Sequence, residues 1–132
     1  MTNREPGDGA APTRREAAED ALRAERLESL ARLEALTREF DGIVASSDGV
    51  ATDDEHDPEG ATIAFERART AGLIESTRQR LADLDEALAR IGEGSYGICQ
   101  RCGQPIAPGR LAARPAARTC INCASALACL AG

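Results

Sequence analysis

Two long stretches with apolar residues at helical spacing, two Cys-x-x-Cys pairs and a near absence of aromatic side chains predict an all-α, metal-stabilised fold. The 132 residues include no Trp, one Tyr and two Phe, so the large side chains that fill an ordinary core are missing. Zinc modules bind their metal with about 10–16 kcal/mol, more than the net stability of a typical domain. We therefore expect an antiparallel coiled-coil helical hairpin on a C4 zinc-finger base, with a short C-terminal helix.

The first helix is expected to follow a polar, Gly- and Pro-containing tail of residues 1–12, which we predict to be disordered. Thr13-Arg14-Arg15-Glu16 forms a capping-box pattern, which marks a helix start. Apolar residues then recur at steps of three to five and predict an amphipathic helix to about Ser47. They are Leu22, Leu27, Leu30, Leu33, Leu36, Phe40 and Ile43.

The second helix is predicted to begin at Asp57-Pro58-Glu59, with Asp as N-cap and Pro at the first helical position. Its apolar seam alternates steps of three and four, which is the heptad spacing of a coiled coil. Gly92 is the expected C-terminal stop. Residues 13–92 would thus form the hairpin, with a tip loop at 48–60. The seam residues are Ile74, Thr77, Leu81, Leu84, Leu88 and Ile91.

The predicted tip loop is strongly acidic. Six carboxylates fall within twelve residues that contain no Lys or Arg. A solvated polar turn and a charged tip that is delivered to a cationic or metal-containing pocket of a partner are both consistent with this pattern. The carboxylates are Asp48, Asp53, Asp54, Glu55, Asp57 and Glu59; the single His56 between them is expected to be solvated.

The two Cys-x-x-Cys pairs lie in the last predicted part, residues 93–132, and are separated by seventeen residues. This spacing is typical of a zinc ion held by four thiolates, and Gly97 and Gly103 flank the first pair where its knuckle needs positive φ. Four sulfurs leave no position for a catalytic water, so we expect one structural Zn²⁺ and no enzymatic activity. The predicted ligands are Cys99, Cys102, Cys120 and Cys123.

Other readings of the cysteines are weaker. A thiol oxidoreductase would need a βαβ pattern around one pair, and the sequence has none. Cys129 lies six residues beyond the last ligand, and we expect it to be a small buried hydrophobe in a short helix over Ala124–Leu130. An odd count of five cysteines also argues against a disulfide framework.

Charge is divided unevenly along the chain. All sixteen basic residues are Arg; through Glu93 the chain has 12 Arg against 22 acids, and beyond it four Arg and no acid. An acidic body with a small basic finger argues against a general nucleic-acid binder, because phosphate neutralisation needs a continuous basic surface, and we expect no direct sequence-specific DNA binding. No apolar stretch approaches a membrane span and no signal segment is apparent, so we expect a soluble, cytoplasmic monomer.

The block from Asp85 to Cys123 contains motifs that are more specific than paired Cys-x-x-Cys alone. They are Tyr96-Gly97-Ile98-Cys99, Cys102-Gly103, Arg110-Leu111, Ala113-Arg114-Pro115 and Cys120-Ile121-Asn122-Cys123. Through these motifs the block resembles the DksA/TraR family of C4 zinc-finger transcription regulators. The resemblance implies a protein that binds bacterial RNA polymerase directly, passes the hairpin into the secondary channel and places the tip residues Asp53, Asp54, Glu55 and Asp57 near the active centre. It also implies polymerase-rim or nucleotide contacts for Arg110 and Arg114.

Two departures from the family pattern qualify these expectations. The family's Asp-x-x-Asp-x-Ala tip is matched only by Asp54-Glu55-His56-Asp57-Pro58-Glu59, with Glu in place of Ala, or from Asp57 with the second Asp missing. Two family lysines that contact guanosine tetraphosphate align with Asp83 and Ala124. We therefore expect a weak response or none to this nucleotide, since an acid faces its phosphates.

Two function classes remain open. The leading hypothesis is a non-enzymatic modulator of RNA polymerase that acts through its acidic tip. The alternative is a zinc-dependent module that binds another protein or RNA through the arginines of the finger. Binding by such a module would survive deletion of residues 48–60 and would fade with added salt.

Overall fold

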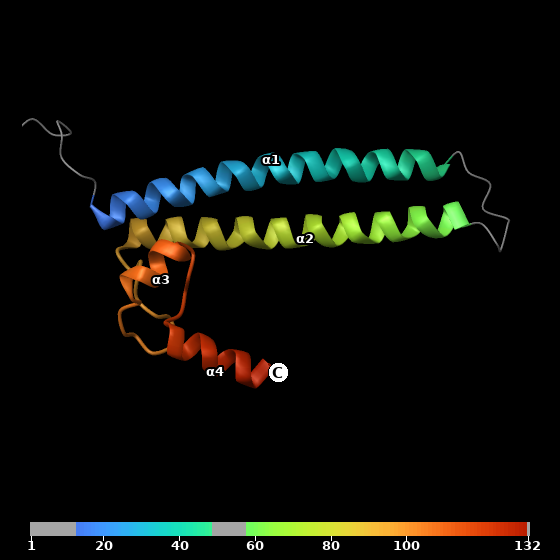
Figure 1. Cartoon of the computed structure of the whole chain (residues 1–132). Coiled ribbons are helices and arrows are strands. Elements are labelled where there is room, and N and C mark those ends of the chain that lie inside the picture. The colour runs from blue at the N-terminus through green and yellow to red at the C-terminus, as the bar shows by residue number, and fades with distance from the viewer. Residues whose placement is uncertain (1–12, 49–57, 132) are drawn as a thin grey trace, which may run out of the picture. The chain divides into compact units, whose positions relative to one another are not determined.

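The computed structural model describes residues 13–48 and 58–131, and the described chain is entirely helical apart from the connections. Its helices are α1 (Arg14–Asp48), α2 (Pro58–Glu93), α3 (Pro108–Ala113) and α4 (Ile121–Ala131). Figure 1 shows α1 and α2 as long antiparallel neighbours, with α3 and α4 following the end of α2. The predicted fold class, a long helical hairpin with a four-cysteine module, is confirmed.

The chain divides into two compact units. The first, which we call the finger unit, holds the start of α1 up to Glu25 and everything from Leu84 onward. The second, the hairpin unit, runs from Arg26 to Asp83. Each unit therefore contains one portion of both long helices, packed against each other.

The start of α1 follows the predicted capping pattern. The Glu16 amide donates to the Thr13 hydroxyl at 3.1 Å, and the Ala17 amide donates to the Thr13 carbonyl at 2.9 Å. Thr13 thus satisfies donors that a helix N-terminus leaves without an intrahelical partner. The tip residues and the predicted N-cap Asp57 lie outside the described residues.

The C-terminal stop of α2 is Gly94, and the prediction that placed it at Gly92 is wrong. The Gly94 φ angle is +80°, whereas Gly92 lies within the helix. The Ser95 amide donates to the Arg90 carbonyl at 3.0 Å and the Gly94 amide to the Ile91 carbonyl at 3.3 Å. This pair of bonds is the Schellman motif, which needs a left-handed residue at the position of Gly94.

The buried face of each long helix follows a repeat of seven. On α1, Leu22, Ser29 and Leu36 are buried. Leu27 and Leu30, which were predicted to lie in the seam, are 68% and 38% exposed, because they stand five and eight residues after Leu22 and so leave the helix face that the repeat of seven defines. On α2 the buried residues spaced by seven are Thr70, Thr77, Leu84 and Ile91.

Polar residues occupy part of this seam in the hairpin unit. Ser29, Thr70 and Thr77 are all buried. The Thr77 hydroxyl donates to the Leu73 carbonyl at 2.7 Å, one turn earlier in α2, so its burial leaves no donor unsatisfied. The seam is therefore narrower and more polar than a pattern of leucines suggests.

The finger unit has its own apolar core. Leu22 of α1 meets Leu84, Ala87 and Ile91 of α2, and Ala116 from the chain between α3 and α4 completes the cluster. The side chains of Leu88 and Tyr96 pack against it. The start of α1 is thereby held against the segment that carries the cysteines.

The two short helices differ in how far the sequence predicted them. The apolar C-terminal segment forms α4, which begins at Ile121, three residues earlier than expected. The six-residue α3 was not predicted, although Pro108 at its first position is a typical start signal. Within residues 13–48 and 58–131, no helix has the length and apolar character needed to cross a membrane.

Candidate metal centre

The four predicted ligands come together in the finger unit. The sulfurs of Cys99, Cys102, Cys120 and Cys123 all lie within 4.8 Å of one another. A tetrahedral zinc ion with Zn–S bonds of about 2.3 Å requires sulfurs about 3.8 Å apart. The Cys102 and Cys120 sulfurs, one from each pair, are 3.8 Å apart, so these two sulfurs already have the spacing that the ion requires.

The first pair sits in a tight knuckle. The Cys99 amide donates to the Gln104 carbonyl at 2.8 Å, and the Gly103 amide donates back to the Cys99 carbonyl at 2.9 Å. Gly97 and Gly103 have φ angles of +85° and +77°, as the sequence analysis expected. Residues with a side chain adopt these angles at a cost, so both glycines hold the knuckle in shape.

The second pair uses a helix start. Cys120 directly precedes α4, and the Ala124 amide donates to its carbonyl at 2.9 Å. The Gln100 amide donates to the Arg118 carbonyl at 2.9 Å and thereby joins the two knuckles. The first knuckle and the N-terminus of α4 thus each supply two of the four sulfurs of the metal site.

Backbone amides prepare the sulfurs for a cation. Amide donors from Cys102 and Cys120 lower the pKa of the Cys99 thiol to about 6, and the Cys123 amide lowers the pKa of Cys120. The Cys123 thiol donates to the Cys120 sulfur, which raises the pKa of Cys123 to about 12. In the protein without metal the sulfurs therefore share protons unequally, and a zinc ion takes the place of those protons.

A polar cluster that the sequence analysis did not single out ties this site to α2. The Glu86 carboxylate accepts from Arg90 at 3.1 Å, from Arg118 at 3.2 Å and from Gln100 at 3.2 Å. Only 6% of the Arg90 side chain is exposed, and it also donates to the Ala117 carbonyl at 3.5 Å. The pair of Glu86 and Arg90 could have been predicted from their spacing of four on one helix. The contact with Arg118, 32 residues away, could not.

The predicted finger arginines have different surroundings. The Arg110 side chain donates to the Thr119 carbonyl at 2.9 Å and so supports the chain just before Cys120. Arg114 ends α3, and its side chain is exposed. The tip residues Asp53, Asp54, Glu55 and Asp57, and the side chain of Cys129, lie outside what the structure describes.

The comparisons with known proteins agree with this geometry. Residues 94–127 match the prokaryotic dksA/traR C4-type zinc finger. A 44-residue segment is 50% identical to an uncharacterized protein of Aquifex aeolicus and covers 33% of this chain and 30% of that protein. A 57-residue segment is 39% identical to the RNA polymerase-binding transcription factor DksA of Caulobacter vibrioides and covers 43% of this chain and 40% of that protein.

A likeness to a solved structure extends beyond the finger. The transcription factor DksA2 from Pseudomonas aeruginosa is similar with a TM-score of 0.72 and 29% identity, over 86% of this chain and 82% of that one. The curated relatives match over less than half of their own length. The zinc-finger match and the four clustered cysteines show that residues 94–127 form a C4 zinc finger of the DksA/TraR family, with one structural Zn²⁺, and the similarity to DksA2 extends this likeness across the hairpin.

Proposed function

We propose that this protein is a non-enzymatic regulator that binds bacterial RNA polymerase directly and modulates transcription. The observation that carries the proposal is the similarity to the transcription factor DksA2, because it covers 86% of the chain and includes both long helices as well as the finger. The name of the Caulobacter relative, an RNA polymerase-binding transcription factor, supports the same partner.

The acidic loop is the proposed effector. Asp53, Asp54, Glu55 and Asp57 lie in the segment between α1 and α2, which contains no Lys or Arg. Through the family resemblance we infer that the hairpin enters the secondary channel and brings these carboxylates to the active centre. There they would attract basic residues or a catalytic Mg²⁺, with each charge-assisted contact contributing about 1.5–3 kcal/mol.

The finger unit is the proposed anchor on the polymerase. Of the four arginines beyond Glu93, Arg110 and Arg118 are engaged within the unit. Arg101 and Arg114 are exposed on its surface and are the arginines that we propose for the polymerase rim. The proposal does not extend to guanosine tetraphosphate, because Asp83 and Ala124 stand where the resemblance implies lysines.

The test is co-purification of the full-length, zinc-loaded protein with core RNA polymerase of its host, followed by transcription in vitro. We expect the protein and its Asp54→Asn/Asp57→Asn variant to bind equally, while only the unchanged tip alters transcript yield. The matched control, Asp20→Asn/Asp41→Asn, removes the same charge from exposed positions on α1 and should keep the effect.

Two results would contradict the proposal. Failure of the unchanged protein to associate with polymerase would remove the partner. Capture of a different protein or an RNA that survives deletion of residues 48–60 and fades with salt would favour the interaction module that acts through the finger. Because Arg110 and Arg118 are engaged within their own unit, less charge is available for that alternative.

A further inference from the structure

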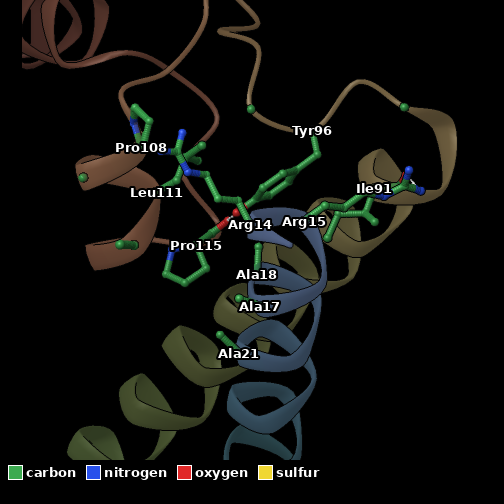
Figure 2. A pocket seen from close by; sticks show the side chains of 14 residues that line it. Arg14, Arg15, Ala17, Ala18, Ala21, Ile91, Tyr96, Pro108, Leu111 and Pro115 are labelled. Atoms are coloured by element: carbon green, nitrogen blue, oxygen red, sulfur yellow. Dashed lines mark hydrogen bonds between the residues drawn. The ribbon is translucent and has the colours of Figure 1, made fainter. Parts of the chain in front are cut away.

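A cleft in the finger unit, away from the four cysteines, has the properties of a ligand site. Its volume is about 800 Å³. That is within the range of about 300–1,000 Å³ that small-molecule sites occupy. The first turns of α1, the end of α2 with the chain that follows it, and α3 with Pro115 form its walls (Figure 2).

The floor of the cleft is apolar. The floor is formed by the short side chains of Ala17, Ala18 and Ala21 of α1. Ile91 of α2 and Leu111 of α3 line the cleft from the other elements. Short side chains on one wall of a helical packing leave room that larger residues would fill. Apolar surface of this kind favours a ligand with a hydrocarbon or aromatic body.

One wall is held in place by a hydrogen bond. The Tyr96 hydroxyl donates to the Pro115 carbonyl at 2.7 Å, which fixes the ring at the edge of the cleft. A Cβ added at Gly97 would stand 3.4 Å from Leu111, so the neighbouring wall is already in contact there. The hydrogen bond of Tyr96 and the contact of Gly97 with Leu111 therefore fix the shape of this wall of the cleft.

The charge of the lining is the opposite of the charge of the chain. Among the described residues that line it, Arg14 and Arg15 are the only charged ones and none is a carboxylate, although the chain as a whole has a net charge of −6. Figure 2 shows the two side chains extending in different directions from α1, Arg14 toward Leu111 and Pro108, and Arg15 toward Ile91.

The guanidinium groups of Arg14 and Arg15 differ in how firmly each is held in place. One terminal nitrogen of Arg15 donates to the Ile91 carbonyl at 2.8 Å, so this side chain is ordered while most of its five N–H groups remain for other acceptors. The Arg14 side chain is exposed and reaches over the cleft. The guanidinium groups of Arg15 and Arg14 lie beside apolar surface. This combination suits a ligand that has an anionic group joined to an apolar body.

We propose that this cleft binds a small amphipathic organic anion, with an aliphatic or aromatic body on the alanine floor and one carboxylate, sulfonate or phosphate held by Arg14 and Arg15. The proposal goes beyond the function in transcription and does not depend on it. Because α1, α2 and α3 all line the cleft, a bound ligand would stabilise their packing and thereby the base of the hairpin.

The test is a fluorescence titration of the full-length, zinc-loaded protein with anilinonaphthalene sulfonate, followed by displacement with decanoate. We expect saturable binding at one site, with amide chemical-shift changes at cleft residues such as Ala18 and Gly97. Neutral phenylnaphthylamine, which has the same body without the sulfonate, should bind at least about fivefold more weakly.

Two variants with matched controls locate the site. Arg14→Gln should weaken sulfonate binding at least about fivefold and Arg14→Lys should recover part of it, while Arg32→Gln, exposed elsewhere on α1, should change nothing. Ala17→Glu places a carboxylate in the lining, near a helix N-terminus that accepts acidic residues, and should weaken binding at least about tenfold. Ala31→Glu is its control.

Three results would overturn the proposal: no saturable binding; equal effects of Arg14→Gln and Arg32→Gln; or binding that is seen only after residues 1–12 have been deleted. The last result would mean that the chain's own N-terminal residues occupy the cleft.

Discussion

At the scale of single residues, Glu86 is the acceptor on which three parts of the finger unit converge. It pairs with Arg90 on its own helix, with Gln100 of the first knuckle and with Arg118 ahead of the second. The pair with Arg90 is not an ordinary surface ion pair, because the Arg90 side chain is almost fully buried. The loss of the carboxylate would leave that cation with a neutral acceptor.

We predict that Glu86→Gln lowers the free energy of unfolding of the zinc-loaded protein by about 1–2 kcal/mol, between the values for exposed and buried ion pairs, since 41% of the Glu86 side chain is exposed. Urea unfolding measures this change. The same substitution at Glu19 breaks only its solvent-accessible pair with Arg23 and should cost less than about 0.5 kcal/mol. Equal effects of the two substitutions would show that the Glu86 cluster adds nothing to stability.

The cysteine sulfurs carry a pH dependence whose direction follows from their surroundings. The pKa of Cys99 is lowered from 9.0 to about 6, so the folded finger favours its thiolate. This contribution to stability is complete above the unfolded pKa and is lost as the pH falls through about 6. The pKa of Cys123 is raised, so at neutral pH this thiol still holds the proton that zinc must displace.

Zinc binding at neutral pH should therefore release fewer protons than the four thiols could supply, and the number should rise toward four as the pH falls below about 6. Titration calorimetry in buffers of different ionisation enthalpy counts these protons, and a Cys129→Ser background removes the fifth thiol. Release of four protons at neutral pH would mean that the metal-free cysteines are not held in the arrangement described above.

At the scale of elements, the end of α2 depends on one glycine. Gly94 has a positive φ, and the amides of Gly94 and Ser95 each donate one of the two hydrogen bonds of the Schellman motif. Gly92, two residues earlier, lies in the last turn with open space around its Cα. The two glycines therefore have opposite requirements although they are close neighbours in the sequence.

We predict that Gly94→Ala destabilises the protein by about 1–2 kcal/mol, because a Cβ strains a left-handed residue. Gly92→Ala should instead be neutral or stabilising by up to about 1 kcal/mol, because Ala is the better helix former. Thermal unfolding of the two variants, each loaded with zinc, provides the comparison. If Gly92→Ala lost as much stability as Gly94→Ala, the assignment of the C-terminal stop of α2 to Gly94 would be contradicted.

At the scale of the whole molecule, charge separates along the chain into two regions of opposite sign. Through Glu93 acids outnumber arginines by 22 to 12, while the part beyond it has arginines and no acid. In the proposed function this division corresponds to an acidic effector and a basic anchor. The polymerase experiment tests the two regions separately, since the tip variant should keep binding and lose the effect on transcription.

Much of the fold could be predicted because its signals are local. The start of α1 at Thr13 follows from a capping pattern within four residues, and the knuckle glycines follow from their position beside the cysteines. The seam of α1 was only partly predicted, since Ser29 is buried while Leu27 is exposed. Hydrophobicity alone misleads where the register of a heptad decides which face meets the partner helix.

The metal site could be predicted from the sequence alone, because four thiolates at knuckle spacing identify zinc whatever surrounds them. The way that site is attached to α2, and the position of the cleft beside Arg14 and Arg15, are visible only in the folded structure. The Glu86–Arg118 pair joins residues 32 apart, and the bond from Arg15 to Ile91 joins residues 76 apart. Contacts of this kind depend on which helix faces meet after folding, and no local pattern in the chain specifies them.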